Sequence, residues 1–479
     1  MSFIYFQLLI KSVINNPQIE IKSMNYTNID SHIKDIKTFE KTGTFFDEFI
    51  RVRNQTIEIV TPLEIEDYVV QTEAFMSPPR WHIGHLTWFY DQLLRKFYDG
   101  YRPFRENYDF YFNSYYLTFG ELFNKSRRGT LSRPTVKETI EYWNYVNEQV
   151  FNFLNNVNGN LNENVRQLFI LGFHHEYQHQ ELMVYDLQHL LADKYMPVEM
   201  NEPPANGRQL KKGEMIEIPG GIFEMGFDKY SFPGVFAYDI EMPLHKVFLN
   251  DYKIDRYPVT NGEYLEFMND GGYSNFKYWL SEGWEAVRAN NWKAPLYWQM
   301  NDNGKWSKID FRGEKNISEI SDEPVINVSY FEAAAYAKWA GKRLPTEAEW
   351  EKASSYDESK KEKYLYPWGN DNPSSEYSNL FDSRIWSPVK AGTYDKFKSP
   401  YGCCQMIGDC WEWTSSEFMP YPGFKTGFEE YNDKWFNNQK VLKGGSFGTP
   451  GISTRNTYRN FFKTHERWMI SGFRCAEFN

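Results

Sequence analysis

The histidines are the residues best suited to chemistry, because five of the nine are concentrated in two short segments. His175 and His179 are four residues apart in HHEYQHQE, so on a helix they would share one face, with imidazoles one turn apart. Two imidazoles at that spacing can bind one metal ion. His174 would point about 100° away, and we expect it to pack or to form a hydrogen bond. The other segment, WHIGH, supplies His82 and His85 as candidates for a third ligand.

The string His175-Glu176-Tyr177-Gln178-His179 also fits H-E-x-x-H, in which two histidines bind zinc and the glutamate is a general base. A zinc peptidase is therefore one hypothesis. Such enzymes take a third ligand from further along the chain, but the next histidine, His189, is predicted to lie on the same helix and to face elsewhere. Three imidazoles with open coordination positions suit iron and zinc about equally. The spacing alone does not choose the metal.

Helices must position these histidines. From about residue 35 to 200, apolar residues recur at three- and four-residue intervals. This spacing predicts helices within 61–75, 85–100, 136–157 and 165–195. The last is the longest and should be the central, buried helix of a bundle. Helix-start signals occur at Thr61-Pro62, at Ser77-Pro78-Pro79 and at Thr135.

The sequence changes character after residues 196–214, a segment rich in proline, asparagine and charge that we interpret as the domain boundary. Short strand-like runs at 215–226 and 245–260 alternate with turn residues, and short helices are predicted at 260–269 and 329–341. No long alternating ladder is visible. Because aromatic residues make up 18% of the chain, we expect an α+β domain with irregular loops packed around buried rings.

Composition excludes several classes of protein. The 53 basic and 64 acidic residues give a net charge of −11, and no run of five or more basic residues occurs, which argues against nucleic-acid binding. The four cysteines are too few and too clustered for a disulfide framework, so a reducing cytoplasm is expected. The N-terminal run FIYFQLLI lacks the features of a signal peptide and is too short to span a membrane. We predict a leader over 1–34, a helical bundle with the metal site over 35–205 and the α+β domain over 206–479.

Motifs in both halves resemble known families. In the first half, SPPRWHIGHLTWF, FNSYY, RRGTLSRPT and HHEYQHQE resemble the DinB-like bundle of the ergothioneine-biosynthesis sulfoxide synthases, the EgtB family. In the second half, IPGGIFEMG, YPVTNGEY, RLPTEAEWEKA, YPWGN and KGGSF resemble a formylglycine-generating-enzyme-type domain, also called the sulfatase-modifying-factor type, which is C-type-lectin-like. The resemblance extends from about residue 45 to the end. It implies a multidomain α and α+β protein, with a four-helix DinB-like bundle preceding the α+β domain.

The resemblance implies an iron(II)-dependent, O₂-using enzyme that joins a thiol to the imidazole C2 of hercynine (Nα-trimethylhistidine) and leaves a sulfoxide. The implied iron ligands are His85, His175 and His179, with His82 structural or beside the site. Three neutral histidines would leave coordination positions for hercynine, the thiolate and O₂. The second domain is expected to contribute the loop in the 460s to a cleft over the metal.

Further site residues also follow from the resemblance. Tyr115 and Tyr116 match a tyrosine pair placed by the iron, where a phenol could supply a proton to reduced oxygen. Gln178 and Asn460 match residues on the hercynine side. Phe461 could offer its ring face to the trimethylammonium group.

Departures from the family pattern bear on the thiol. Relatives that use γ-glutamylcysteine carry Asp and Arg where this chain has Phe462 and Glu466, so a second substrate carboxylate would be repelled. We therefore predict cysteine as the thiol, with Arg127 and Arg128 as candidates for its carboxylate or else as a solvated turn.

Several alternatives stay open. A selenoneine synthase or an ovothiol-type synthase would be a sister enzyme, whereas a zinc peptidase and a non-catalytic binding module belong to other classes. Formylglycine-generating activity is disfavoured, because no cysteine follows the GGS motif within 444–459. The sequence does not specify the oligomeric state, and a homo-oligomer is one of the states it allows.

Overall fold

The computed structural model describes residues 45–114, 121–157, 161–205, 211, 213–428, 431 and 433–478. The expected leader over 1–34 lies outside them. The chain divides into two compact units, the first formed by residues 1–70, 78–106 and 130–176 and the second by 71–77, 107–129 and 177–479. The division falls inside one helix, between Glu176 and Tyr177.

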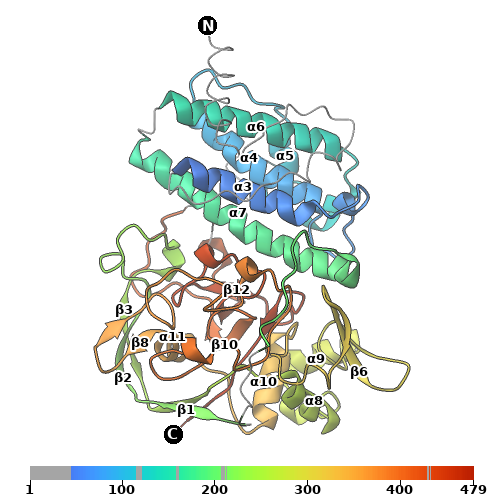
Figure 1. Cartoon of the computed structure of the whole chain (residues 1–479), viewed down its shortest axis with the longest axis vertical. Helices are drawn as coiled ribbons and strands as arrows, with labels where there is room; N and C mark the ends of the chain where they lie inside the picture. The colour runs from blue at the N-terminus through green and yellow to red at the C-terminus, as the bar shows by residue number, and fades with distance from the viewer. Residues whose placement is uncertain are drawn as a thin grey trace. The chain divides into compact units, whose positions relative to one another are not determined.

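The first unit is helical, as predicted. It contains α3 (Phe45–Val60), α4 (Pro79–Phe97), α6 (Val136–Asn156) and the first half of α7 (Glu163–Leu190), which run beside one another in Figure 1. Their apolar faces are buried at helical spacing, for example Tyr142, Val146 and Val150 on α6. The 28-residue α7 confirms the long helix expected near residues 165–195.

Two of the three expected helix starts are confirmed. Pro79 is the first residue of α4, where a missing N–H costs nothing. At the start of α6, the Thr135 hydroxyl accepts a hydrogen bond from the Glu138 backbone N–H, and the Glu138 carboxylate accepts one from the Thr135 N–H. This capping box satisfies two amides that the helix itself leaves without partners.

The predicted helix within 61–75 is wrong. Thr61 continues the last turn of α3, because its N–H and its hydroxyl both donate to the Ile57 carbonyl. The Glu64 N–H is then taken by the Asp67 carboxylate at 3.0 Å, a local side-chain bond that competes with helix formation. The segment forms turns and only a short 3₁₀ helix, Asp67–Val69.

The second unit is α+β, as expected, with several small sheets. The described strands are β1 (Met215–Ile218), β2 (Gly221–Met225), β3 (His245–Leu249), β4 (Tyr252–Asp255), β5 (Trp298–Met300), β6 (Trp306–Asp310), β7 (Gly313–Asn316), β8 (Tyr356–Asp357), β9 (Glu362–Lys363), β10 (Trp411–Glu417), β11 (Lys440–Lys443), β12 (Asn460–Phe462), β13 (Ser471–Gly472) and β14 (Ala476–Phe478). The sheet orders are β1-β4-β14, β12-β11-β10-β13, β2-β3, β5-β6-β7 and β8-β9.

Helices in the second unit agree in part with expectation. α8 (Asn261–Asn269) and α10 (Tyr330–Trp339) confirm the helices predicted at 260–269 and 329–341. The short α5 (Tyr108–Phe112), α9 (Ser281–Asn290) and α11 (Glu347–Ser355) were not predicted individually. α11 begins with a capping box between Thr346 and Glu349, so the sequence did carry its start signal.

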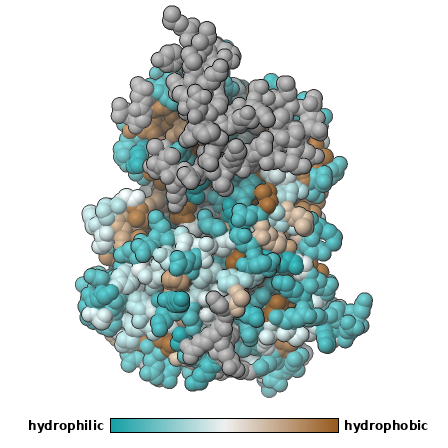
Figure 2. Space-filling model, in the orientation of Figure 1, coloured by the Kyte–Doolittle hydropathy of each residue, from teal (hydrophilic) through white to brown (hydrophobic). Residues whose placement is uncertain are grey.

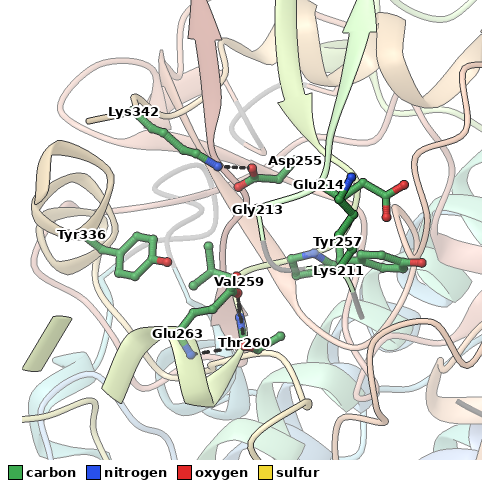
Figure 3. Close-up of a pocket in the computed structure, with 11 residues that line it drawn as sticks. Lys211, Gly213, Glu214, Asp255, Tyr257, Val259, Thr260, Glu263, Tyr336 and Lys342 are labelled. Atoms are coloured by element: carbon green, nitrogen blue, oxygen red, sulfur yellow. Dashed lines mark hydrogen bonds and ion pairs between the residues drawn. The ribbon is translucent and has the colours of Figure 1, made fainter. Parts of the chain in front are cut away.

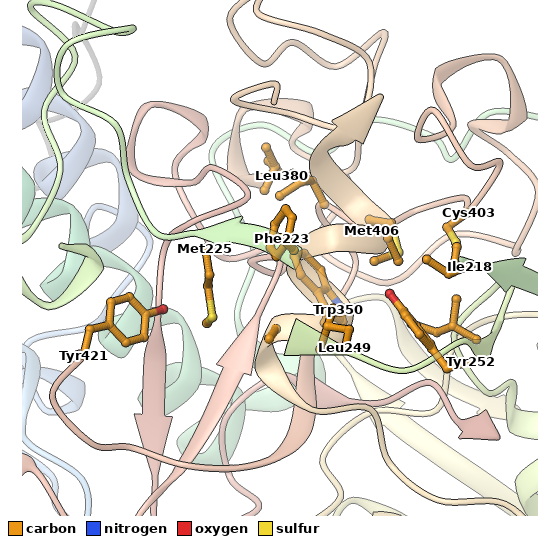
Figure 4. Close-up of a cluster of buried hydrophobic side chains, with 14 residues drawn as sticks. Ile218, Phe223, Met225, Leu249, Tyr252, Trp350, Leu380, Cys403, Met406 and Tyr421 are labelled. Atoms are coloured by element: carbon orange, nitrogen blue, oxygen red, sulfur yellow. The ribbon is translucent and has the colours of Figure 1, made fainter. Parts of the chain in front are cut away.

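Buried aromatic and aliphatic side chains hold the second unit together. Figure 4 shows one cluster, in which Trp350 of α11 lies among side chains from β2, β3, β4 and the 403–406 segment. Trp350 is fully buried, and its indole N–H donates to Glu412 at 2.7 Å. This packing explains how an α+β domain with short strands remains ordered.

The surface is predominantly hydrophilic on the face shown in Figure 2, where coloured hydrophobic residues occur in small groups. Among the described residues, no helix is both long and apolar enough to cross a lipid bilayer.

Candidate metal centre

Three histidines from two helices converge. His85 lies on α4, and His175 and His179 lie one turn apart on α7. Each offers a ring nitrogen, and these nitrogens all lie within 4.8 Å of one another. The Nε2 atoms of His85 and His175 are 3.1 Å apart. This is the arrangement required of side chains that share one ion.

The spacing fits a metal ion. Two nitrogens about 2.1 Å from one ion lie about 3.0 Å apart at right angles and about 3.4 Å apart at the tetrahedral angle. The 3.1 Å between His85 and His175 falls in that interval. Burial, together with the nearby His82, lowers the pKa of His175 to about 3, so its ring is neutral and has a lone pair to give. Neutral imidazoles suit iron, zinc and copper.

Aromatic rings pack against two of the three histidines, His85 and His175. Trp81 and Trp88 stack near the His85 ring, with centroids at 4.7 and 5.8 Å and interplanar angles of 11° and 16°. Phe89 lies against His175 at 5.1 Å. His85 is fully buried, whereas His179 is 9% exposed. Held rings lose little side-chain entropy when they bind an ion.

His82 is buried but stands outside the group of three. Its ring meets Trp81 edge-on at 5.6 Å. The described residues that could hold an ion together are His85, His175 and His179, and neither His82 nor His174 is among them.

Glu176 points into the bundle. It is fully buried, its Oε2 accepts from Arg53 Nη1 at 3.0 Å, and its Oε1 accepts from the Thr56 hydroxyl at 2.5 Å. The Arg53 guanidinium in turn lies 3.1 Å from the centroid of the Trp143 ring. Because both of its oxygens accept these hydrogen bonds inside the bundle, the Glu176 carboxylate is unavailable as the general base that a zinc peptidase needs.

Gln178 is held by two tyrosines. Its Nε2 donates to the Tyr458 hydroxyl at 2.9 Å, and its Oε1 accepts from the Tyr431 hydroxyl. Sequence reasoning selected Gln178 but missed both tyrosines, because they lie 253 and 280 residues further along the chain.

Glu181, one turn after Gln178, is a second anchor that sequence reasoning missed. Its Oε1 accepts from the Tyr185 hydroxyl at 2.5 Å, the Trp411 indole at 2.7 Å and the Ser446 hydroxyl at 2.9 Å, and also from Thr449. Burial raises the pKa of Glu181. Side-chain donors from across the second unit therefore bind the second half of α7.

Asn460, Phe461 and Phe462 form β12. Asn460 is paired with Leu442 of β11, and its side-chain oxygen accepts from the Phe461 N–H at 2.9 Å. One face of the Phe461 ring stacks on Phe418, with centroids 4.0 Å apart. The Phe462 ring meets Trp468 nearly at right angles, at 6.1 Å.

The two predicted arginines differ in environment. Arg128 is buried, and its Nη1 donates to the Ser77 hydroxyl at 2.9 Å. Burial lowers the pKa of Arg128 to about 9, although Asp186 opposes the shift. Arg127 is exposed. Tyr115 and Tyr116 lie outside the described residues.

The second unit also contains a small cavity, drawn in Figure 3, that is separate from the candidate site. It measures about 50 Å³, enough for one or two water molecules, and none of the candidate site residues lines it. Four of the charged side chains that line it have partners: Lys342 contacts Asp255 at 2.6 Å, Glu214 contacts Arg256 at 3.2 Å, and Glu263 caps α8 through Thr260.

The cysteines are buried and free. Burial raises the pKa of Cys403 to about 11 and that of Cys404 to about 12, which disfavours the reactive thiolate.

Each half of the chain matches a known protein family. Residues 48–183 match the DinB superfamily, and residues 199–478 match the sulfatase-modifying factor enzyme 1-like domain. A hercynine oxygenase of Mycolicibacterium smegmatis is 39% identical over 317 residues, which cover 64% of this chain and 71% of that protein. A hercynine oxygenase of Mycobacterium tuberculosis is 37% identical over 311 residues, with the same two coverages.

The formylglycine-generating enzyme of Mus musculus is 31% identical over 280 residues, 52% of this chain and 70% of that protein. The matched families confirm the predicted fold class: a DinB-type helical domain followed by a sulfatase-modifying-factor-type domain.

Proposed function

Since the chain belongs to the hercynine oxygenase (EgtB) family, and is therefore an oxygenase, we propose that it joins the imidazole C2 of hercynine to the thiol of cysteine in ergothioneine biosynthesis. Its co-substrate would be O₂ and its product a sulfoxide. The observation that carries the proposal is the convergence of His85, His175 and His179 within 4.8 Å.

The proposed reaction balances. Hercynine loses the C2 hydrogen and cysteine the thiol hydrogen as the C–S bond forms, which releases two electrons. Oxidation of sulfur to the sulfoxide releases two more. O₂ accepts all four: one oxygen atom ends on sulfur, and the other leaves as water with the two hydrogens.

Iron(II) held by His85, His175 and His179 would activate O₂ and lower the pKa of the substrate thiol. The protein's own groups would orient the reactants. Gln178 and Asn460 are proposed to hold hercynine, with Phe461 beside its trimethylammonium group. Tyr115 or Tyr116 would donate a proton to oxygen.

Cysteine is favoured as the thiol because the γ-glutamyl recognition groups are missing. Phe462 packs on Trp468 where those relatives carry an acid. Glu466 accepts a hydrogen bond from the Lys463 backbone N–H at 3.0 Å and brings negative charge where they carry an arginine. Arg128, fixed by Ser77, and Arg127 remain the proposed partners of the cysteine carboxylate.

The peptidase alternative is disfavoured by Glu176, which Arg53 and Thr56 hold inside the bundle. The four free, buried thiols support a reducing compartment, so we propose a cytoplasmic location.

The test is product analysis by mass spectrometry. Protein reconstituted anaerobically with Fe(II) is mixed with hercynine and cysteine and then exposed to air. We expect the hercynylcysteine sulfoxide, with ¹⁸O in the product when ¹⁸O₂ is supplied. Protein loaded with zinc is the matched control and should give none. A γ-glutamylcysteine kcat/KM above that of cysteine would refute the thiol assignment, and no sulfoxide with either thiol would refute the function.

A further inference from the structure

Gln178 is held through both ends of its side-chain amide. Nε2 donates to the Tyr458 hydroxyl at 2.9 Å, and Oε1 accepts from Tyr431. Gln178 is half-buried, whereas both tyrosines are buried. We propose that Tyr431 and Tyr458, together called the tyrosine clasp, are positioning residues that orient the Gln178 amide toward hercynine; this proposal rests on the proposed function.

The clasp is itself rigid. The fully buried Tyr238 stacks on both of its members, at 6.0 Å and 11° for Tyr431 and at 5.5 Å and 22° for Tyr458. Trp411 meets Tyr458 edge-on at 5.5 Å, and the Trp411 indole is tied to Glu181. The two hydroxyls therefore have fixed positions from which to hold an amide.

The two hydrogen bonds to the Gln178 amide lower the entropy cost of binding a ligand to it. A glutamine on a helix surface loses about 1–2 kcal/mol of rotamer freedom when it is ordered. In this protein that ordering is already achieved by Tyr431 and Tyr458. One N–H and one lone pair of the amide stay available, in a plane that the clasp sets. A ligand bound there meets a preorganised partner.

Neither tyrosine is proposed to react. Burial raises the pKa of Tyr458, so its hydroxyl keeps its proton. Tyr431 and Tyr458 act on hercynine binding through Gln178. The experiment must therefore separate an effect that depends on Gln178 from an effect that does not.

The test is a kinetic double-mutant cycle on the full-length, iron-loaded enzyme. Tyr458→Phe keeps the ring stack and removes only the hydroxyl. We expect it to raise the KM for hercynine about fivefold, the effect of one lost hydrogen bond. The kcat, the KM for cysteine and the bound iron should stay within about twofold of wild type. Tyr431→Phe should act in the same direction.

The decisive comparison uses Gln178→Ala. If the clasp works through Gln178, then Tyr458→Phe causes no further rise in the hercynine KM once Gln178 is alanine. Tyr252→Phe is the matched control, because Tyr252 is also buried, with its hydroxyl bonded to the Glu349 carbonyl at 2.6 Å. Its kinetics should equal those of wild type.

Two results would overturn the clasp while wild-type enzyme consumes hercynine: an unchanged KM in both single tyrosine variants, or an equal KM rise with and without Gln178. Wild-type enzyme that fails to consume hercynine would instead overturn the proposed function, and the clasp with it.

Discussion

The buried ion pair of Arg53 and Glu176 allows a quantitative test of how much this contact between α3 and α7 stabilises the fold. Its atoms are 3.0 Å apart, and the two side chains are 4% and 0% exposed. Attraction between unit charges at about 4 Å is about 4 kcal/mol at an effective dielectric constant of about 20. Replacing Arg53 by Met leaves Glu176 buried without its cation. We expect Arg53→Met to lower the free energy of unfolding by about 3–5 kcal/mol.

Two further variants separate charge from packing. Arg51→Met on the same helix removes a more exposed partner of Glu48, with side chains 24% and 28% exposed, and should cost at most about 1 kcal/mol. The double variant Arg53→Met with Glu176→Met removes both buried charges and should recover most of the loss.

Urea denaturation followed by circular dichroism measures these free energies. The double variant should take up as much iron as wild type on reconstitution, since Glu176 is bonded to Arg53 and Thr56 and does not belong to the group of three histidines. Equal losses for Arg51→Met and Arg53→Met would refute the reasoning about burial. A double variant that lost iron but stayed folded would refute the assignment of Glu176 to the bundle interior.

Three further predictions concern the metal, the proton and pH. His179→Ala should abolish stoichiometric iron binding, measured by metal analysis, while the helical circular dichroism is retained; full iron content would contradict its role as a ligand. Replacing Tyr115 and Tyr116 together by Phe should lower the sulfoxide yield and divert turnover to oxidation of the thiol, and an unchanged product ratio by mass spectrometry would dismiss their proton-donor role. Burial raises the pKa of Asp409 to about 6, so the stability it contributes is present below its unfolded pKa and is lost as pH rises through 6. Unfolding free energies should therefore fall between about pH 4 and 6 by up to about 1.4 kcal/mol per pH unit from this group, and Asp409→Asn should remove that slope.

Local sequence determined the features that depend on neighbours along the chain. The four-residue spacing of His175 and His179 puts them on one face of any helix, and the Thr135–Glu138 pair marks the start of α6 without help from the rest of the fold. Local signals failed at Thr61, which bonds back to the last turn of α3, and at Glu64, whose backbone N–H donates to Asp67 and not to a new helix.

The tertiary structure alone decided which distant groups meet. His82 and His85 were both candidates from spacing, and only the packing of α4 against α7 brings His85 to 3.1 Å from His175. The orientation of Glu176 toward Arg53, the burial of Arg128 beside exposed Arg127, and the hold of Tyr431 and Tyr458 on Gln178 likewise depend on residues far apart in sequence. Periodicity shows which face of a helix is apolar. The partner of a buried polar side chain is set by the element that packs against it, because the desolvation free energy of an unpaired buried polar group exceeds the net stabilisation that a typical hydrogen bond gives.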